Sequence, residues 1–247
     1  MQQLDAQRFA VHFSEFVSLA DAGAGLQAYV EALETKHRLF AAALADPARL
    51  DLAQLEELLG SVFTARRKLY PAIEALGAEA FAARVAQLLG GQATIGAFCD
   101  ALPMPEDRAA RRKLRGAAHD FGAELLHFGD PVRHPLMTRW VWDASSGSGA
   151  LRELMREERG AGEVDHAAAR AWLYERIAEQ GIWRNQHWLA DLVLAMAYVT
   201  YFRAMTGGVL GSDFTRGSTP EEQLRKLLGL DAAGGRPRVR KSAATIH

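Results

Sequence analysis

Apolar residues recur three and four positions apart along most of the chain, which is the spacing of amphipathic helices. Phe9, Phe13 and Phe16 begin one such stripe, and a second helix is predicted over residues 26–44, before the Asp46-Pro47 breaker. No run of alternating β-branched residues reaches the length of a strand. The pattern therefore predicts an all-α protein, built as a compact array of short helices.

Capping residues and helix breakers set the predicted helix ends. Asp51 with Gln54 three positions later opens a predicted helix over residues 51–70, and Pro71 opens the next, over 72–89. Thr219, followed by a proline and by Glu222, is the clearest helix start in the chain. Further helices are predicted over residues 94–102, 106–115, 117–128, 150–160, 165–180 and 186–205.

The serine and glycine run at 145–149 is the best candidate for a domain boundary, because it supplies flexible backbone with little to bury. We expect a helical domain over 1–144, a C-terminal helical subdomain over 150–231 packed on it, and a disordered basic tail over 232–247. The uncharged core of the helix over 186–205 is only eleven residues long, from 192 to 202, which is too short for a membrane span. That helix is predicted to be central and buried.

Composition removes several classes of function. A chain of 247 residues with 49% hydrophobic residues can bury a full core, and its single cysteine, Cys99, excludes a disulfide framework and a thiolate zinc site. The first sixteen residues contain charged side chains among the apolar ones, unlike a secretory signal. We therefore expect a cytoplasmic protein that is not inserted in a membrane.

The charge balance hides local basic clusters. The chain has 29 basic and 30 acidic side chains, yet basic residues gather at 66–68, 108–115 and 236–241. A neutral chain of this kind is not a wholly basic nucleic-acid binder, but a local patch can still contact phosphates. The alternative is an ordinary solvated helix face. The candidate nucleic-acid contacts are Arg111, Arg112, Lys113, Arg115 and Gly116.

Three Glu-x-x-His pairs occur, at Glu34, Glu124 and Glu163 with the histidines three positions later. Residues three apart share a helix face, so each pair could offer a carboxylate and an imidazole to one metal ion. Glu124 and His127 are the best candidates because other acids and histidines lie nearby. Glu34 stands beside Lys36 and Arg38, a pattern typical of a solvated face with local ion pairs. Apart from this transition-metal alternative, no cofactor is predicted.

Two tryptophan-rich segments form a second candidate site. Trp140 and Trp142 cannot share a helix face, so this segment either joins two packed surfaces, with Arg139 paired to Asp143, or presents an aromatic ring to a ligand. If the two segments meet in space, they would line a pocket between the helical halves. The candidate pocket residues are Arg139, Trp140, Trp142, Asp143, Trp183, Arg184, His187 and Trp188.

Residues 114–143, LRGAAHDFGAELLHFGDPVRHPLMTRWVWD, resemble the core segment of the helix-hairpin-helix DNA glycosylase superfamily. In that family a glycine-containing hairpin opens a helix, a short loop follows, and an aspartate completes the site. Leu114 and Gly116 stand near the hairpin leucine and first glycine, and Gly122-Ala123 near the small residues of the next helix. The resemblance implies a glycosylase-like helical scaffold, and a hairpin whose backbone amides hold a DNA phosphate.

The segment also departs from that family. The second hairpin glycine is Ala118, the lysine position of the bifunctional branch falls near Asp120, and the aspartate position falls near Thr138. Threonine cannot supply the charge that stabilises an oxocarbenium-like sugar. If the scaffold is shared, glycosylase activity is therefore expected to be absent.

These patterns support three hypotheses. The first is a non-catalytic helical accessory protein that binds a macromolecule, including nucleic acid through its local basic clusters. The second is an enzyme, metal-dependent or acting on a small molecule, with its site between the two helical halves. The third is a helical assembly factor that binds a protein client beside the long apolar helix. The sequence leaves the ligand, the partner and the oligomeric state open.

Overall fold

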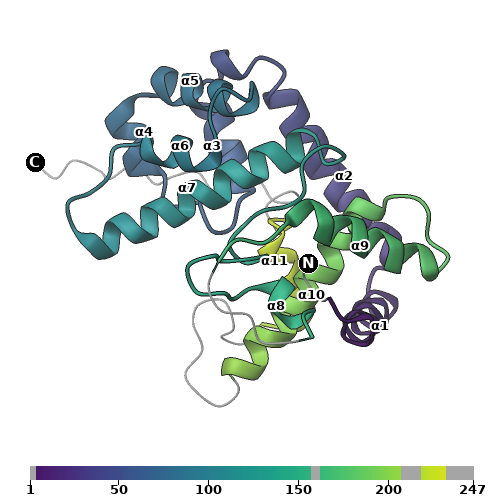
Figure 1. The fold of residues 1–247 in the computed structure, drawn as a ribbon. Coiled ribbons are helices and arrows are strands. Elements are labelled where there is room, and N and C mark those ends of the chain that lie inside the picture. Colours follow the sequence, from purple (N-terminus) through teal and green to yellow (C-terminus); the bar gives the residue numbers. More distant parts are fainter. Residues whose placement is uncertain (1–3, 157–161, 207–217, 232–247) are drawn as a thin grey trace, which may run out of the picture.

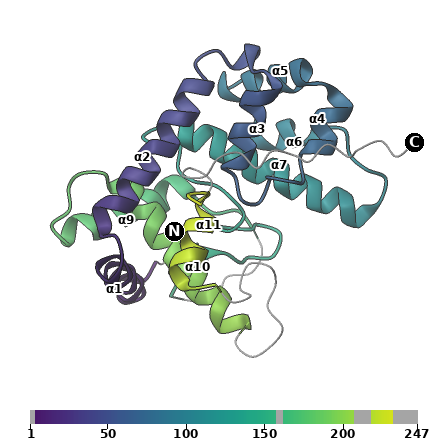
Figure 2. The same cartoon turned by 180° about the vertical axis from the view of Figure 1, so that it is seen from behind.

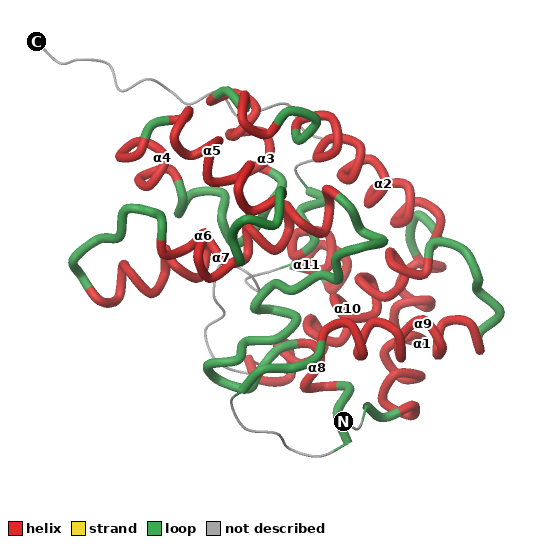
Figure 3. The backbone as a smooth tube through the Cα atoms, turned by 45° about the horizontal axis from the view of Figure 1, so that its top comes forward, coloured by secondary structure: helices red, strands yellow, loops and turns green. Residues whose placement is uncertain are grey.

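The computed structural model describes residues 4–156, 162–206 and 218–231, and none of these residues lies in a strand (Figures 1 and 3). Two isolated backbone bridges, Leu4–Met155 and Asp143–Ser148, are the only β-type pairs in those ranges. The predicted all-α class is confirmed. The elements are, in order, α1 (Ala6–Ala22), α2 (Leu26–Ala43), the 3-10 turn η1 (Pro47–Arg49), α3 (Leu52–Gly60), α4 (Tyr70–Leu76), α5 (Ala78–Leu89), α6 (Ile95–Asp100), α7 (Arg108–Gly129), α8 (Ala150–Glu153), α9 (His166–Glu179), α10 (Gln186–Thr206) and α11 (Pro220–Leu227).

The predicted helix starts are confirmed where the sequence offers a reciprocal cap. At α3 the Asp51 carboxylate accepts from the Gln54 backbone N–H (2.8 Å), and the Gln54 side chain accepts from the Asp51 N–H (3.0 Å). Thr219 and Glu222 form the same arrangement at α11. Each box satisfies two backbone donors that a helix start leaves free.

Several predicted boundaries are wrong. The helix expected over 51–70 ends at Gly60, and turns occupy 61–69. The helix expected over 72–89 is divided at Gly77, whose φ of 84° is a left-handed conformation that glycine adopts without a Cβ penalty. Conversely, Gly116 interrupts nothing, and the helices expected over 106–115 and 117–128 form the single helix α7. Of the helix expected over 150–160, α8 covers Ala150–Glu153, residues 154–156 are not helical, and residues 157–160 lie outside the described ranges.

Helix α7 lies between two groups of helices (Figures 1 and 2). On one side are α3 to α6, and on the other are α1 and α8 to α11, while α2 runs along both groups. The predicted division at 144/150 does not follow this packing, because α1 lies on the second group. The Phe9 ring meets the Trp172 ring of α9 at 5.9 Å, and the Asp5 N–H donates to Leu154 O (2.7 Å).

The serine and glycine run at 145–149 forms a hydrogen-bonded turn rather than an open linker. The Asp143 carboxylate accepts from the Ser145 N–H (3.0 Å), and the Gly147 N–H donates to Asp143 O (2.8 Å). Beyond the turn, the Ala150 N–H donates to Trp140 O (2.8 Å). The chain therefore passes from one helix group to the other through a fixed corner.

The long helix α10 is central, as predicted: the residues from Trp188 to Ala197 are all buried. Helices α1, α8, α9 and α11 pack around it, and it also contacts α2. A helix that is apolar around its whole circumference needs such a cover. Within the described ranges, no helix combines the length and apolar character needed to cross a bilayer.

Candidate functional site

Three polar side chains occupy one buried face of α7. Asp120, Glu124 and His127 follow one another at helical spacing and are at most 3% exposed. Each meets a partner from a different part of the chain: Arg139, Lys36 on α2, and Asp191 on α10 respectively. Buried ionisable groups are costly unless they are paired. This face of α7 therefore carries three buried ionisable side chains, and each of them is paired with a residue from another part of the chain.

The central pair, Lys36 and Glu124, is sealed inside the protein. The ammonium donates to the Glu124 carboxylate (2.5 Å) and to Leu228 O (2.7 Å), and it lies 4.1 Å from the centre of the Phe128 ring. Burial lowers the pKa of Lys36 and raises the pKa of Glu124, and their mutual attraction opposes both shifts. The solvated face predicted around Lys36 is wrong at this residue, because its partner is 88 positions away.

The pair formed by His127 and Asp191 joins α7 to α10. His127 Nε2 lies 2.8 Å from Asp191 Oδ2, and Nδ1 lies 2.8 Å from His134 O. Burial alone would lower the pKa of His127, but the attraction of Asp191 and the two hydrogen bonds outweigh it and raise the pKa. Both ring nitrogens are thus used as donors. Of this pair, only the second carboxylate oxygen of Asp191 remains to meet a ligand.

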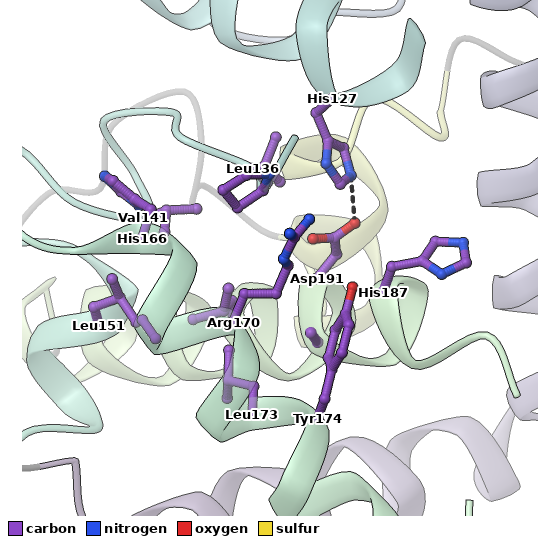
Figure 4. Close-up of a pocket in the computed structure, with 14 residues that line it drawn as sticks. His127, Leu136, Val141, Leu151, His166, Arg170, Leu173, Tyr174, His187 and Asp191 are labelled. Carbon is purple, nitrogen blue, oxygen red and sulfur yellow. Dashed lines mark hydrogen bonds and ion pairs between the residues drawn. The ribbon is translucent and has the colours of Figure 1, made fainter. Parts of the chain in front are cut away.

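A cavity opens beside Asp191, between α7, α9, α10 and the chain leading to α8 (Figure 4). Its enclosed space is about 20 Å³, room for one water-sized group, and the space including its open mouth is about 350 Å³. Leucine, valine, alanine and proline side chains supply most of its wall. The polar residues that line it are His127, His166, Arg170, Tyr174, His187 and Asp191.

Arg170 and Tyr174 are one turn apart on α9 and face this cavity. The Nη1 atom of Arg170 donates to Val132 O (2.8 Å), and the guanidinium carbon lies 5.9 Å from the centre of the Tyr174 ring. The described part of the chain provides no acceptor for the other guanidinium nitrogens. Burial raises the pKa of Tyr174 to about 12, so its hydroxyl stays protonated at neutral pH. In Figure 4 this hydroxyl points toward Asp191.

Two further imidazoles line the cavity. His166 begins α9 and His187 lies in the first turn of α10. Burial lowers the pKa of each of them below the usual value for histidine, 6.5. Both rings are therefore neutral at pH 7 and able to accept a proton. The cavity combines a guanidinium, a phenol, two neutral imidazoles and a carboxylate.

The two tryptophan-rich segments do not converge, so the pocket predicted from them is wrong as a whole. The Trp140 ring lies 6.0 Å from the Tyr198 ring, and the Trp188 ring lies 5.9 Å from the Phe128 ring. Tyr198 is ten residues beyond Trp188 on α10, or about 15 Å along the axis. Trp183 is 75% exposed. Of the predicted set, His187 lines the cavity in Figure 4.

The predicted pair of Arg139 with Asp143 is also wrong. Arg139 donates to Asp120 through its backbone N–H (2.8 Å) and through Nη2 (3.0 Å), while Asp143 caps its own turn. Burial alone would raise the pKa of Asp120, but the nearby His119 ring and the charge and hydrogen bonds of Arg139 outweigh it and lower the pKa. Trp142, between these residues in the chain, donates from Nε1 to Gly162 O (2.7 Å). The segment is a packed corner that joins the helix groups.

The hairpin predicted at residues 114–118 is absent, because these residues lie inside the unbroken helix α7. Gly116 is buried against the Arg139 guanidinium, and a Cβ placed there would overlap that group. Because Gly116 has no Cβ, the Arg139 guanidinium can lie directly against the backbone of α7.

Of the basic residues predicted to contact nucleic acid, some bond to other parts of the protein and some are exposed. Arg111 Nε donates to Pro105 O (3.0 Å), and Arg115 pairs with Asp100. Arg112 and Lys113 are exposed. The basic cluster at 236–241 and the predicted tail at 232–247 lie outside the described residues.

Glu124 and His127 face different partners, so the two residues do not present a shared site to a metal ion. Among the described residues, no group of three or more histidine, cysteine, aspartate and glutamate side chains is placed to hold one. Cys99 is buried, and burial raises the pKa of its thiol to about 11. It is therefore a poor nucleophile at neutral pH.

Comparison of the sequence with protein-family models and with curated proteins, and of the fold with solved structures, finds no match.

No pattern in the sequence indicated that Lys36, Arg170, Tyr174 and Asp191 belong to one arrangement. One signal was present: Asp120, Glu124 and His127 are polar at i, i+4 and i+7 in a helix whose neighbouring positions are apolar. Such a stripe on a buried helix requires partners from elsewhere. Which partners they are depends on contacts between distant segments.

Proposed function

We propose that the protein is an enzyme that acts on a small organic acid by proton transfer, in the cavity between α7, α9 and α10. The observation that carries the proposal is that Arg170, Tyr174 and Asp191 gather at one small, mostly apolar cavity, which His187 also lines. Apolar walls with a few converging polar groups are typical of small-molecule sites. The proposal develops the hypothesis of a site between the two helical halves.

Arg170 is the proposed anchor for the acidic group of the ligand. Its guanidinium keeps free donors after its bond to Val132 O, and a planar donor set suits carboxylate and phosphate oxygens. Tyr174, one turn away, can donate a hydrogen bond from its protonated hydroxyl to the same ligand. These two donors favour an anionic ligand.

His187 is the proposed proton acceptor, because its lowered pKa leaves a neutral imidazole at pH 7. Asp191 is held in place by His127, and its second oxygen can orient a hydroxyl or amino group of the ligand. His127 itself is a positioning residue, since both of its nitrogens are already bonded.

Binding can be tested by calorimetric titration with a panel of small carboxylic and phosphoric acids. Wild-type protein is expected to bind at least one of them, and Arg170→Gln is expected to weaken that binding by about tenfold or more, as for the loss of a charge-assisted hydrogen bond. Arg176→Gln is the matched control, because Arg176 lies on the same helix and pairs with Glu179. No binding by any acid, or equal binding by both variants, would overturn the proposal.

The catalytic part has its own test. In deuterated water, nuclear magnetic resonance would follow exchange of carbon-bound protons in each acid that binds. Exchange is expected with wild-type protein and is expected to be lost in His187→Gln, while acid binding persists. If no bound acid exchanges a proton, the enzyme assignment is overturned and the cavity is a binding site alone.

A further inference from the structure

Arg170 and Asp191 stand at different depths of the cavity. The Nη1 atom of Arg170 donates to the carbonyl of Val132, which is 72% exposed, so this guanidinium lies near the protein surface. Asp191 is 3% exposed. In the described structure the two opposite charges do not pair with each other, because Asp191 pairs with His127. The acid-binding end of the cavity is therefore its mouth, and the Asp191 carboxylate lies at its inner end.

The enclosed part of the cavity admits one small group. Its volume is about 20 Å³, which a single water molecule or hydroxyl group fills, whereas the space including the mouth is about 350 Å³. A small acid therefore fits with its acid group in the open part, near Arg170, and with one group no larger than a hydroxyl in the enclosed part. The chemistry of the surrounding side chains decides what that group is.

The polar groups at the inner end suit a hydroxyl. One Asp191 oxygen accepts from His127, and the other can accept a hydrogen bond from a ligand. The Tyr174 hydroxyl points toward Asp191 in Figure 4, and burial raises its pKa to about 12, so it can donate at neutral pH. A ligand hydroxyl both donates and accepts, so it can bond to the carboxylate and to the phenol together.

An ammonium group is a poorer fit for the same place. It has no lone pair to accept from the Tyr174 hydroxyl. The Asp191 carboxylate also already attracts the His127 imidazole and raises its pKa, and the Arg170 guanidinium lines the same cavity. A ligand ammonium would share one carboxylate with two cations. An alkyl group has the opposite fault, since it leaves the carboxylate and the phenol without a partner.

We infer that the ligands of this cavity are short hydroxy acids, with the acid group at Arg170 and the hydroxyl between Asp191 and Tyr174. The inference rests on the proposed function, and it names the substrate class of that same site. Tyr174 and Asp191 are the residues that select the hydroxyl, whereas Arg170 binds the acid group whether or not a hydroxyl is present.

Ligands matched in length test the inference. Calorimetric titration would compare acetate, glycolate and glycine, and then propionate, lactate, 3-hydroxypropionate and alanine. At least one hydroxy acid is expected to bind about tenfold more tightly than the unsubstituted acid of the same length, as for a hydrogen bond to a charged group. The amino acids are expected to bind no more tightly than the unsubstituted acids.

A conservative variant tests where the hydroxyl binds. Tyr174→Phe keeps the ring and removes the phenol, and it should reduce the hydroxyl gain by about threefold or more while the affinity for the unsubstituted acid stays the same. Tyr198→Phe is the matched control, because Tyr198 packs on Trp140 and does not line the cavity. This control should keep the full gain.

The outcomes separate the inference from the proposed function. If acids bind equally well with and without a hydroxyl at both lengths, the inference is overturned and the proposed function stands. An amino acid that binds more tightly than the hydroxy acid of its length also overturns it, as does an unchanged gain in Tyr174→Phe. If no acid of either length binds, and none of the wider panel does, the proposed function itself fails.

Discussion

Two buried pairs on neighbouring turns of α7 have opposite surroundings. Lys36 and Glu124 are enclosed by the Phe40 and Phe128 rings and by a backbone carbonyl of the chain after α11. His127 and Asp191, one turn further along α7, are equally buried but line a cavity. The pKa values of Lys36, Glu124 and His127 are all shifted, yet only the second pair lines a cavity that a ligand can reach. In this protein, a shifted pKa therefore indicates a functional site only where the shifted group also lines a cavity.

The two pairs also differ in what they leave unsatisfied. The Lys36 ammonium is shared between two acceptors and an aromatic face, which completes its surroundings. One carboxylate oxygen of Asp191 accepts a hydrogen bond from His127, and the other oxygen remains available to a ligand. The first pair thus fixes α2, α7 and the chain after α11 together, whereas the second holds a carboxylate ready at a cavity wall.

The largest effect is expected from breaking the sealed pair. Lys36→Met leaves Glu124 buried without its partner and should lower the free energy of unfolding by about 3–5 kcal/mol, measured by urea denaturation. Lys36→Met combined with Glu124→Met removes both charges and should recover most of that loss. The double variant should still bind acids in the cavity. A single variant within about 1 kcal/mol of wild type would contradict the importance of this pair.

A smaller and pH-dependent effect is expected at the open pair. Asp191→Asn removes a charge-assisted hydrogen bond and should cost about 2 kcal/mol at pH 6. Because the folded-state pKa of His127 is raised above its usual 6.5, the stability from this pair is fully present below pH 6.5 and is lost as pH rises through the folded-state pKa. The difference between wild type and variant should therefore shrink from pH 6 to pH 9. Urea denaturation across that range measures it, and a constant or growing difference would refute the assignment.

The third pair on α7 gives a steric test. Gly116→Ala places a Cβ against the Arg139 guanidinium, which Asp120 holds, and should lower the free energy of unfolding by about 1–2 kcal/mol. Gly96→Ala is the control, because its nearest neighbour, Thr94 Oγ1, is at an ordinary 3.7 Å. That change should be neutral or stabilising, since alanine favours a helix. Equal melting temperatures for the two variants would contradict the close approach.

The smallest effect is expected away from the three pairs, at Trp183. This side chain is 75% exposed, and Trp183→Ala should change the free energy of unfolding by no more than about 0.5 kcal/mol. Acid binding should also be unchanged, because the ring does not line the cavity. A loss of binding in this variant, measured by the same titration, would extend the site beyond the cavity.

The helices and many of their ends could be predicted from local sequence, because caps, breakers and apolar spacing act within a few residues. The capping boxes at Asp51 and Thr219 and the buried α10 follow from such local rules. The split at Gly77 and the continuity at Gly116 did not, since glycine permits a left-handed turn without requiring one.

Which polar groups meet depends on how distant segments of the chain pack together. Lys36 reaches Glu124 across 88 positions, and His127 reaches Asp191 across 64, so neither pairing follows from spacing along a helix. The same holds for Arg139, which sequence proximity assigned to Asp143 and packing assigned to Asp120. Local sequence fixes which face of a helix is polar, whereas the partner of that face depends on how distant helices pack. The candidate site could not be predicted from local sequence, because its residues come from helices that are distant in the chain.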